Sequence, residues 1–258
     1  MSGPVPLLSD RAVVEVFHLV FLRTLLAGTT EKAHIAIKGG CNLRFFFGSQ
    51  RYSEDLDLDV AVIAPHTLRK DVEKVLSGSL LARQLTALGI GLGDTSAPKQ
   101  TETTQRWKVQ LRSAGGAAMP TKIEFSRRPI TGSAELASID RRLLDAYRLP
   151  PVQARHYLID DAIRQKIVAL ADRDVAQARD VFDLDLLLTH SGGKLPAADT
   201  LTRELQQGRE RALSIQYDDF VAKVVAYLEP EEQPLYQTPE IWEAIQLHVA
   251  EALDRMVP

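Results

Sequence analysis

The sequence predicts an α+β fold, with a β-sheet flanked by helices and a helical C-terminal region. Two observations support this prediction. Stretches typical of strands fall in the first half of the chain, whereas from Ala134 onward the pattern is mostly helical and more charged. The Pro150-Pro151 pair marks a boundary, because the residue before a proline is disfavoured in a helix. We therefore expect two domains, residues 1–150 and residues 151–258.

The composition is that of an ordinary globular protein, and it excludes several classes. With 258 residues, of which 45% are hydrophobic, the chain is long enough to bury a substantial core. Its single cysteine excludes an intramolecular disulfide framework and suits a reducing compartment. The net charge of −3 means that any RNA contact needs a local basic patch. The sequence shows no signal peptide and no membrane span, so we expect a cytoplasmic protein without a membrane partner.

The first helix and the first strand lead to a glycine turn. Ser9 is a good N-cap for a helix over residues 10–26, whose apolar side chains recur near helical spacing. A short apolar strand at residues 35–37 then breaks close to Gly39-Gly40. Glycines let backbone N–H groups approach a phosphate closely, although a lone Gly-Gly pair is usually only a turn.

The strand expected at residues 55–60 carries the strongest functional signal. Aspartates alternate in it with Leu or Val, and successive side chains of a strand point to opposite faces. Asp55 and Asp57 therefore share one face, where two carboxylates can bind the same Mg²⁺ or pair of cations. Asp57 with Asp59 is an alternative pair, and the solvated face of an edge strand is the structural alternative. Together with the upstream glycines, the acids indicate a site for a metal ion and a triphosphate.

Two further strands, at residues 106–111 and 122–125, follow a helical tract and a loop. The tract opens at Pro65 and ends near Leu88. Residues 89–99 are rich in Gly, Pro and Ser, which is typical of a loop. The two strands are recognised by their alternating pattern and by the glycine-rich turn between them.

Glu124 is the candidate for a third metal ligand. It lies in the second of these strands between the apolar residues Ile123 and Phe125, which face the other way, as a third metal ligand on a central strand would. The alternative on the sequence alone is a surface glutamate that pairs with Lys122 or Arg127 across the sheet. The residues by themselves leave both interpretations open.

Four short motifs lie between residues 38 and 57: Lys38-Gly39-Gly40, Leu43-Arg44, Gly48-Ser49 and Arg51-Tyr52-Ser53-Glu54-Asp55-Leu56-Asp57. In this order they closely resemble the AbiEii-like toxins, the MenT-type group of the polymerase-beta-like nucleotidyltransferase superfamily. The signature of that superfamily is a small-residue turn followed by an acid-apolar-acid strand. The resemblance covers about residues 30–190. It implies a mixed-sheet nucleotidyltransferase core flanked by helices, and a helical C-terminal domain that completes the active-site cleft.

The resemblance also implies roles for individual residues. Asp55, Asp57 and Glu124 are expected to bind Mg²⁺ or Mn²⁺, and Asp55 and Asp57 are expected to be catalytic. The residues expected to bind the nucleotide are Lys38, Gly39, Gly40, Ser49, Arg51, Ser53 and Lys166.

A second informative stretch, at residues 160–188, is expected to form two helices. Its patterns K-x3-L-x2-R and R-D-x-F-D-L resemble the closing motif of the family, in which the lysine meets the nucleotide phosphates and the first aspartate orients substrate. This implies catalytic roles for Lys166 and Asp180, with Asp183 as the alternative to Asp180. Without the family, a helical hairpin with surface salt bridges would explain the same pattern.

The residues after position 190 are expected to form three more helices, at residues 197–215, 218–228 and 240–256. Their apolar side chains are mostly core candidates, and their scattered arginines are typical of a solvated face. This region carries no recognisable chemistry.

The function implied by the resemblance is metal-dependent transfer of a nucleoside monophosphate from an NTP to an acceptor, expected to be the tRNA 3′ end. Relatives act as toxins in type IV toxin–antitoxin or phage-defence pairs, so a cognate antitoxin protein is the expected partner. We expect the toxin itself to be a monomer. The alternative is a nucleotidyltransferase or phosphotransferase that modifies a protein or small-molecule hydroxyl.

Overall fold

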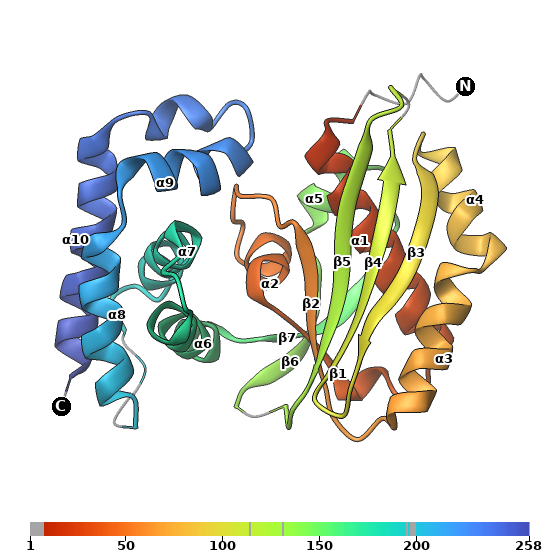
Figure 1. The fold of residues 1–258 in the computed structure, drawn as a ribbon, viewed down its shortest axis with the longest axis horizontal. Helices are drawn as coiled ribbons and strands as arrows, with labels where there is room; N and C mark the ends of the chain where they lie inside the picture. Colours follow the sequence, from red (N-terminus) through yellow and green to blue (C-terminus); the bar gives the residue numbers. More distant parts are fainter. Residues whose placement is uncertain (1–7, 114, 131, 195, 197–199, 258) are drawn as a thin grey trace. The chain divides into compact units, whose positions relative to one another are not determined.

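A mixed β-sheet of seven strands organises the first part of the chain (Figure 1). The structure is a computed structural model that describes residues 8–113, 115–130, 132–194, 196 and 200–257. The strands are β1 (Ile35–Lys38), β2 (Asp55–Val60), β3 (Gly91–Gln100), β4 (Thr104–Arg112), β5 (Ala118–Arg127), β6 (Ala134–Ser138) and β7 (Gln153–Tyr157). They are ordered β3-β4-β5-β2-β1-β7-β6, and β2 runs antiparallel to β1 and parallel to β5. The predicted α+β fold with a mixed sheet is confirmed.

The chain divides into two compact units, which we describe separately. Unit 1 consists of Met1–Phe46 and Tyr52–His156, and unit 2 consists of Phe47–Arg51 and Tyr157–Pro258. The sequence suggested a division at residue 150, whereas the sheet continues past that point. It does so because β7 pairs with β1, His156 lying opposite Ile37 in a parallel register.

The helices of unit 1 are α1 (Asp10–Gly28), α2 (Gly39–Phe46), α3 (Pro65–Leu76), α4 (Ser79–Ala87) and α5 (Arg141–Ala146), with a short 3₁₀ helix, η1 (Lys32–His34). Helix α1 begins as predicted, because the Ser9 side chain accepts a hydrogen bond from the backbone N–H of Ala12 at 3.2 Å. Helices α1, α3 and α4 lie together along one side of the sheet (Figure 1). They form one core with the inward side chains of the sheet, among them Leu56 and Leu58, which are fully buried.

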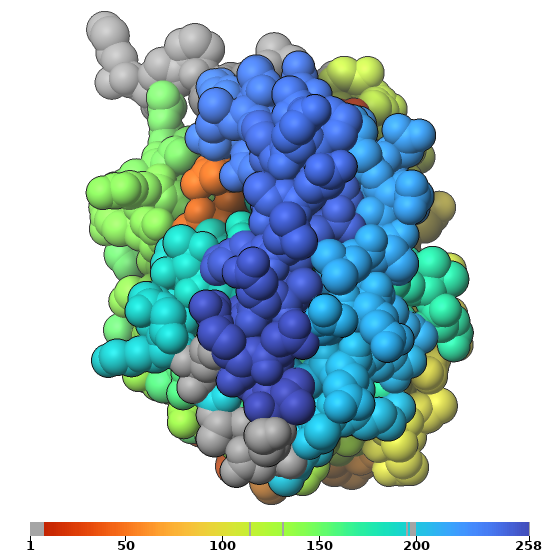
Figure 2. Space-filling view, turned by 90° about the vertical axis from the view of Figure 1, so that its left-hand side faces the viewer, coloured from red at the N-terminus to blue at the C-terminus, as the bar shows by residue number. Residues whose placement is uncertain are grey.

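Unit 2 is helical, as predicted. Its helices are α6 (Ile159–Asp172), α7 (Ala178–His190), α8 (Thr202–Ser214), α9 (Tyr217–Lys223) and α10 (Pro239–Met256), with the 3₁₀ helices η2 (Val225–Tyr227) and η3 (Gln233–Tyr236). Helices α8 and α10 pack side by side and form much of the face seen in Figure 2. The start expected at residue 197 for the helix now seen as α8 lies outside the described residues.

Side chains of α10 satisfy the end of α8. Trp242 Nε1 donates to the backbone carbonyl of Ile215 at 3.0 Å, and Gln246 Nε2 donates to the carbonyls of Ala212 and Ile215. The last carbonyls of a helix have no partner within the helix, so these bonds fix where α8 stops.

None of the helices in the described ranges is both long and apolar enough to cross a membrane.

Candidate active site

The three predicted metal ligands lie on one face of two neighbouring strands in unit 1. In the parallel pairing of β2 with β5, Asp57 lies opposite Glu124 and Asp55 lies opposite Lys122. Paired residues share a face of the sheet, so the carboxylates of Asp55, Asp57 and Glu124 project from the same side. The buried residue Leu56 projects from the opposite face, into the core.

Two of these acids are ion-paired in the structure. Asp55 Oδ2 lies 2.8 Å from Lys122 Nζ, and Glu124 Oε2 lies 2.6 Å from Arg106 Nε. The partners that the sequence suggested for Glu124 were Lys122 or Arg127. The structure gives Glu124 the arginine of β4 instead, because Arg106 lies opposite Glu124 in the antiparallel pairing of β4 with β5.

Among the three aspartates of β2, Asp57 differs from Asp55 and Asp59 because it forms no ion pair in the part of the chain that the structure describes. Its carboxylate forms no hydrogen bond or ion pair with any other described residue, although the side chain is partly buried. Burial raises the pKa of Asp57 above its ordinary value, and the negative charges of Asp55 and Glu124 raise that pKa further, while Lys38 and Lys122 oppose the shift. An unpaired carboxylate in such a place is costly unless a cation binds it.

The chemistry of this face fits a hard divalent cation. Carboxylate oxygens are the ligands that Mg²⁺ and Mn²⁺ prefer, and a cation would neutralise the charge of Asp57. Within the described ranges, however, no group of three His, Cys, Asp or Glu side chains already has the arrangement of a metal site. A metal ion held by all three acids would compete with Lys122 for Asp55 Oδ2 and with Arg106 for Glu124 Oε2.

The glycine turn lies beside Asp57. Strand β1 ends at Lys38, which lies opposite Asp57 in the antiparallel pairing and places its Nζ 2.5 Å from Asp59 Oδ1. Gly39 then opens α2 with φ +64°, and a Cβ atom added to it would lie 3.1 Å from Asp57 Oδ2. Gly39 is thus required both by its backbone conformation and by the closeness of the acid.

Replacing Gly39 by alanine is expected to impair catalysis as well as stability. The positive φ costs about 1 kcal/mol or more for a residue with a Cβ, and the added methyl group presses on the Asp57 carboxylate. The matched control is Gly89→Ala, since Gly89 has φ +75° and nothing within 4 Å of an added Cβ. Thermal unfolding should show similar losses for both variants, whereas nucleotide transfer should fall several-fold only for Gly39→Ala. Equal activity of the two variants would contradict the close approach to Asp57.

Three further residues expected to bind the nucleotide are engaged in contacts within the protein. Ser53 Oγ donates to the backbone carbonyl of Asp55 at 2.9 Å, within unit 1. Ser49 and Arg51 belong to unit 2, where Ser49 is buried and its Oγ accepts from the backbone N–H of Arg51 at 3.3 Å. Nucleotide contacts by Ser49, Arg51 and Ser53 stay predictions.

The second predicted motif forms a buried ion-pair cluster in unit 2. Lys166 Nζ of α6 lies 2.9 Å from Asp180 Oδ1 and 2.6 Å from Asp183 Oδ2, both on α7. Arg51 binds Asp183 through Nε and Nη2 at 2.9 to 3.2 Å, and Arg173 Nε lies 2.7 Å from Asp180 Oδ2. Both aspartates are fully buried. We call these five residues the unit 2 cluster.

The unit 2 cluster holds Asp183 and Lys166 in their charged forms. Burial opposes the charge of Asp183, but Arg51 and Lys166 outweigh burial, and the pKa of Asp183 is lowered. Burial likewise opposes the charge of Lys166, while Asp180 and Asp183 outweigh it and raise the pKa of Lys166. Lys166 is therefore a buried cation shared by two carboxylates, and a phosphate contact by it stays a prediction.

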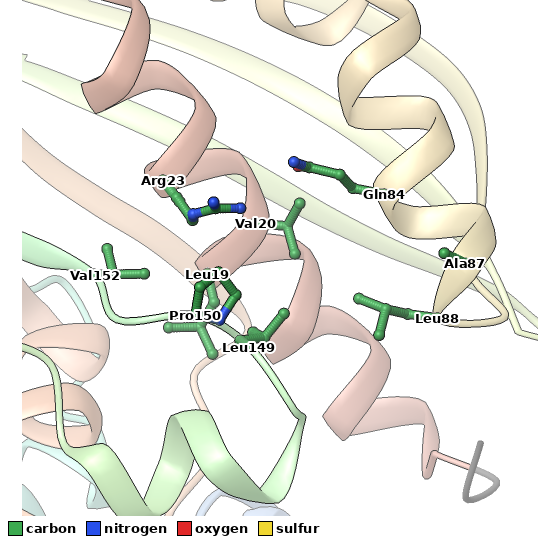
Figure 3. Close-up of a pocket in the computed structure, with 9 residues that line it drawn as sticks. All are labelled: Leu19, Val20, Arg23, Gln84, Ala87, Leu88, Leu149, Pro150 and Val152. Carbon is green, nitrogen blue, oxygen red and sulfur yellow. The ribbon is translucent and has the colours of Figure 1, made fainter. Parts of the chain in front are cut away.

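A cavity of unit 1 lies apart from all of these residues. It has a volume of about 190 Å³ and is lined by Leu19, Val20, Arg23, Gln84, Ala87, Leu88, Leu149, Pro150 and Val152 (Figure 3). Arg23 and Gln84 are its polar lining residues. None of the predicted site residues lines this cavity, so it is not a candidate for the reaction.

Comparison with known proteins agrees with the motifs. A sequence profile of the family described as nucleotidyl transferase AbiEii toxin, type IV TA system, matches residues 20–258 of the chain. No curated protein matches the chain closely enough to count as a relative.

Solved structures share the fold. JHP933 from Helicobacter pylori is 21% identical with a TM-score of 0.59, over 96% of this chain and 95% of that one. A putative nucleotidyltransferase from H. pylori is 21% identical with a TM-score of 0.60, over 96% and 99% of the two chains. MenT4, a nucleotidyltransferase toxin from Mycobacterium tuberculosis, is 15% identical with a TM-score of 0.60, over 97% and 96%. At these identities the likeness shows the fold alone.

Proposed function

Because the chain belongs to the AbiEii family of nucleotidyltransferase toxins of type IV toxin–antitoxin systems, we propose that it transfers a nucleoside monophosphate from an NTP to the 3′ end of tRNA. Family membership supports the reaction class and a cognate antitoxin protein as partner. The tRNA acceptor rests on the family resemblance and fits the basic residues on the face of the acids, Arg106, Lys108 and Lys122.

The observation that carries the proposal is the unpaired carboxylate of Asp57 between Asp55 and Glu124. Burial and the neighbouring charges of Asp55 and Glu124 raise the pKa of Asp57, so its carboxylate charge is unfavourable here, and a divalent cation would stabilise it. We propose that Asp55, Asp57 and Glu124 hold Mg²⁺ or Mn²⁺. When bound there, the metal supplies a lowered pKa of the acceptor hydroxyl and charge neutralisation on the triphosphate.

The glycine turn is proposed to bind the phosphates. Gly39 and Gly40 are the first two residues of α2, and the first N–H groups of a helix have no partner within it. Such groups favour anionic oxygens, and the Lys38 ammonium at the preceding position adds positive charge. A substrate phosphate held there would lie beside Asp57, because Asp57 is the nearest neighbour of Gly39 across the turn.

We propose catalytic roles for Lys166 and Asp180 on the condition that Lys166 gives up one of its carboxylate partners when the substrate binds. Lys166 is shared by Asp180 and Asp183 in the unit 2 cluster. To meet a phosphate it would have to exchange one of these carboxylates for a phosphate oxygen. The cluster as a whole would then be the group that orients the substrate, with Arg51 keeping Asp183 in place.

Transfer of label from an NTP tests the proposed reaction. The protein is incubated with Mg²⁺ and each of the four α-labelled NTPs, together with purified tRNA, total RNA lacking tRNA, or a protein extract. We expect label on tRNA, and none from γ-labelled NTP, because the bond broken lies between the α and β phosphates. Asp57→Asn is the inactive control.

The other outcomes separate the competing functions. Label on protein or on a small molecule would replace tRNA as the acceptor. Label from the γ phosphate would make the chain a phosphotransferase. No transfer to any fraction from any NTP would contradict the proposed function.

A further inference from the structure

A buried chain of hydrogen bonds lies beneath the start of the acidic strand in unit 1. His18 Nε2 of α1 is 2.8 Å from Thr121 Oγ1 of β5, and Thr121 Oγ1 donates to the backbone carbonyl of Glu54 at 2.7 Å. Cys41 Sγ of α2 lies 3.7 Å from His18 Nδ1 and 3.3 Å from the backbone carbonyl of Asp55. The three side chains are 1%, 5% and 1% exposed, so water does not compete for these bonds.

The direction of each bond follows from the number of protons available. Thr121 has one hydroxyl hydrogen, and the Glu54 carbonyl takes it. The Thr121 oxygen must therefore accept from His18, which places the ring proton on Nε2 and leaves Nδ1 without a hydrogen. Cys41 has a single S–H hydrogen, which it donates to the Asp55 carbonyl, so its Sγ is in contact with Nδ1 and does not donate to it. Burial lowers the pKa of His18 to about 3, so the ring stays neutral and this pattern does not change near neutral pH.

The chain ends on the peptide groups that begin β2. The carbonyl of Glu54 is held by Thr121, and the carbonyl of Asp55 is held by Ser53 Oγ and Cys41 Sγ. The side chains of Thr121, Ser53 and Cys41 thus fix these two carbonyls, and His18 of α1 acts on the Glu54 carbonyl through Thr121. The direction in which the Asp55 side chain leaves the strand depends on the orientation of its two flanking peptides.

A purely packing role does not explain a histidine at this position. Its neighbours Phe17, Leu19 and Phe21 on α1 are fully buried, and an apolar residue would fill the space without the cost of burying a polar ring. The ring nitrogen instead supplies the one donor that Thr121 needs once its own hydrogen has gone to Glu54. The role of His18 is therefore its hydrogen bond to Thr121.

We propose that His18 and Thr121 are positioning residues for nucleotide transfer, which hold the Glu54–Asp55 peptide so that Asp55 and Asp57 face the metal and the triphosphate. This rests on the proposed function above. Neither residue touches the substrate. Each acts through the backbone of β2.

Matched pairs of variants test the inference. Thr121→Val removes the hydroxyl at nearly constant shape, and Thr121→Ser restores it. His18→Leu removes the ring donor, and His18→Gln offers a carboxamide N–H in place of Nε2. We expect kcat for nucleotide transfer to fall about tenfold in Thr121→Val and His18→Leu, the loss of about one hydrogen bond. The KM for the NTP should stay within about twofold, and the Ser and Gln variants should recover most of kcat.

A second readout does not depend on catalysis. Hydrogen–deuterium exchange of a peptide that covers residues 54–58 should be faster in Thr121→Val than in Thr121→Ser, while a peptide from α6 is unchanged. Melting temperatures should fall by no more than about 5 °C, which shows that the variants are folded at the assay temperature.

The outcomes distinguish the two proposals. A wild-type protein that transfers no label from any NTP overturns the proposed function. A wild-type protein that transfers label, with Thr121→Val as fast as wild type and unchanged exchange at residues 54–58, overturns the positioning role. Should Thr121→Val fail to fold, the same comparison between His18→Leu and His18→Gln decides the question.

Discussion

Asp57→Asn is expected to abolish nucleotide transfer and, at the same time, to raise the melting temperature of the metal-free protein. The carboxylate is unpaired among the described residues, and its pKa is raised by burial and by Asp55 and Glu124. Asparagine has nearly the same shape without the charge, so the cost of burying the charge and the repulsion by Asp55 and Glu124 both disappear. Loss of a metal ligand removes several kcal/mol of transition-state stabilisation, which corresponds to a rate loss of about 10²- to 10³-fold or more.

The pH dependence follows from the sign of the shift. A carboxyl group whose pKa is raised in the folded state destabilises the fold when it ionises. The stability of the metal-free wild type should therefore fall relative to Asp57→Asn as pH rises from below the ordinary aspartate range through the raised pKa. The difference should then stay constant at higher pH. Thermal unfolding in EDTA at a series of pH values measures it.

Asp55→Asn is the matched control. Asp55 is ion-paired with Lys122, so its replacement should reduce activity without raising the melting temperature in EDTA. An Asp57→Asn protein that transfers nucleotide at the wild-type rate, or that melts below wild type in EDTA, would contradict the assignment of Asp57.

Asp183→Ala is expected to have the largest effect on stability, a loss of about 3–5 kcal/mol from unit 2, because it removes the buried carboxylate that pairs with the buried cations of Arg51 and Lys166. The double variant Arg51→Met with Asp183→Leu should recover much of this loss, since it removes both charges together. The control is Asp185→Asn, two residues further along α7 and so on the other side of the helix, where the ion pair with His248 is partly exposed. It should cost about 1 kcal/mol or less.

Tryptophan fluorescence can measure the stability of unit 2 separately from that of unit 1. It has two tryptophans, Trp107 in unit 1 and Trp242 in unit 2. Trp107 Nε1 is buried without a hydrogen-bond partner among the described groups, so Trp107→Phe leaves no donor unsatisfied. In that background, urea unfolding followed by the fluorescence of Trp242 reports on unit 2. An Asp183→Ala loss no larger than that of Asp185→Asn would contradict the account of the unit 2 cluster.

The unit 2 cluster is expected to stabilise the fold only within a defined range of pH. The pKa of Asp183 is lowered, so its contribution is present above the ordinary aspartate pKa and is lost as pH falls through the lowered value. The pKa of Lys166 is raised, so its contribution is present below the ordinary lysine pKa and is lost as pH rises through the raised value. Between the two ordinary values the stability contributed by the pair should be flat.

The alternation of β2 was predictable because a strand has a fixed period of two. Once residues 55–60 were recognised as a strand, one face had to carry the aspartates and the other had to carry Leu56 and Leu58, as the structure confirms. The N-cap of α1 at Ser9 was predictable for a similar reason, since a local side-chain bond creates it.

Strand β3 could not be predicted in the same way. Its residues, Gly91–Gln100, are rich in Gly, Pro and Ser and were expected to form a loop. None of them is fully buried, and they pair with β4 through two register shifts at the edge of the sheet. The strand forms because the backbone of β4 is available for hydrogen bonding. The strand propensity of its residues did not predict it.

The ion-pair partners of the acidic residues also could not be predicted from the sequence. Whether Lys122 pairs with Glu124 or with Asp55 depends on the register between β2 and β5, which no local pattern specifies. The ion pair of Arg51 with Asp183 joins residues 132 positions apart. Local spacing predicted that Asp180 and Asp183 lie on one face of a helix, and it carried no information on what they bind.

The most direct test of the central claim is the position of Mn²⁺ in crystals grown with a non-hydrolysable NTP analogue, located by its anomalous scattering. We expect a peak within ligand distance of the carboxylates of Asp55 and Asp57, with Lys122 no longer bound to Asp55. A peak only at other carboxylates, with Asp57 unliganded in a nucleotide-bound protein, would contradict the claim.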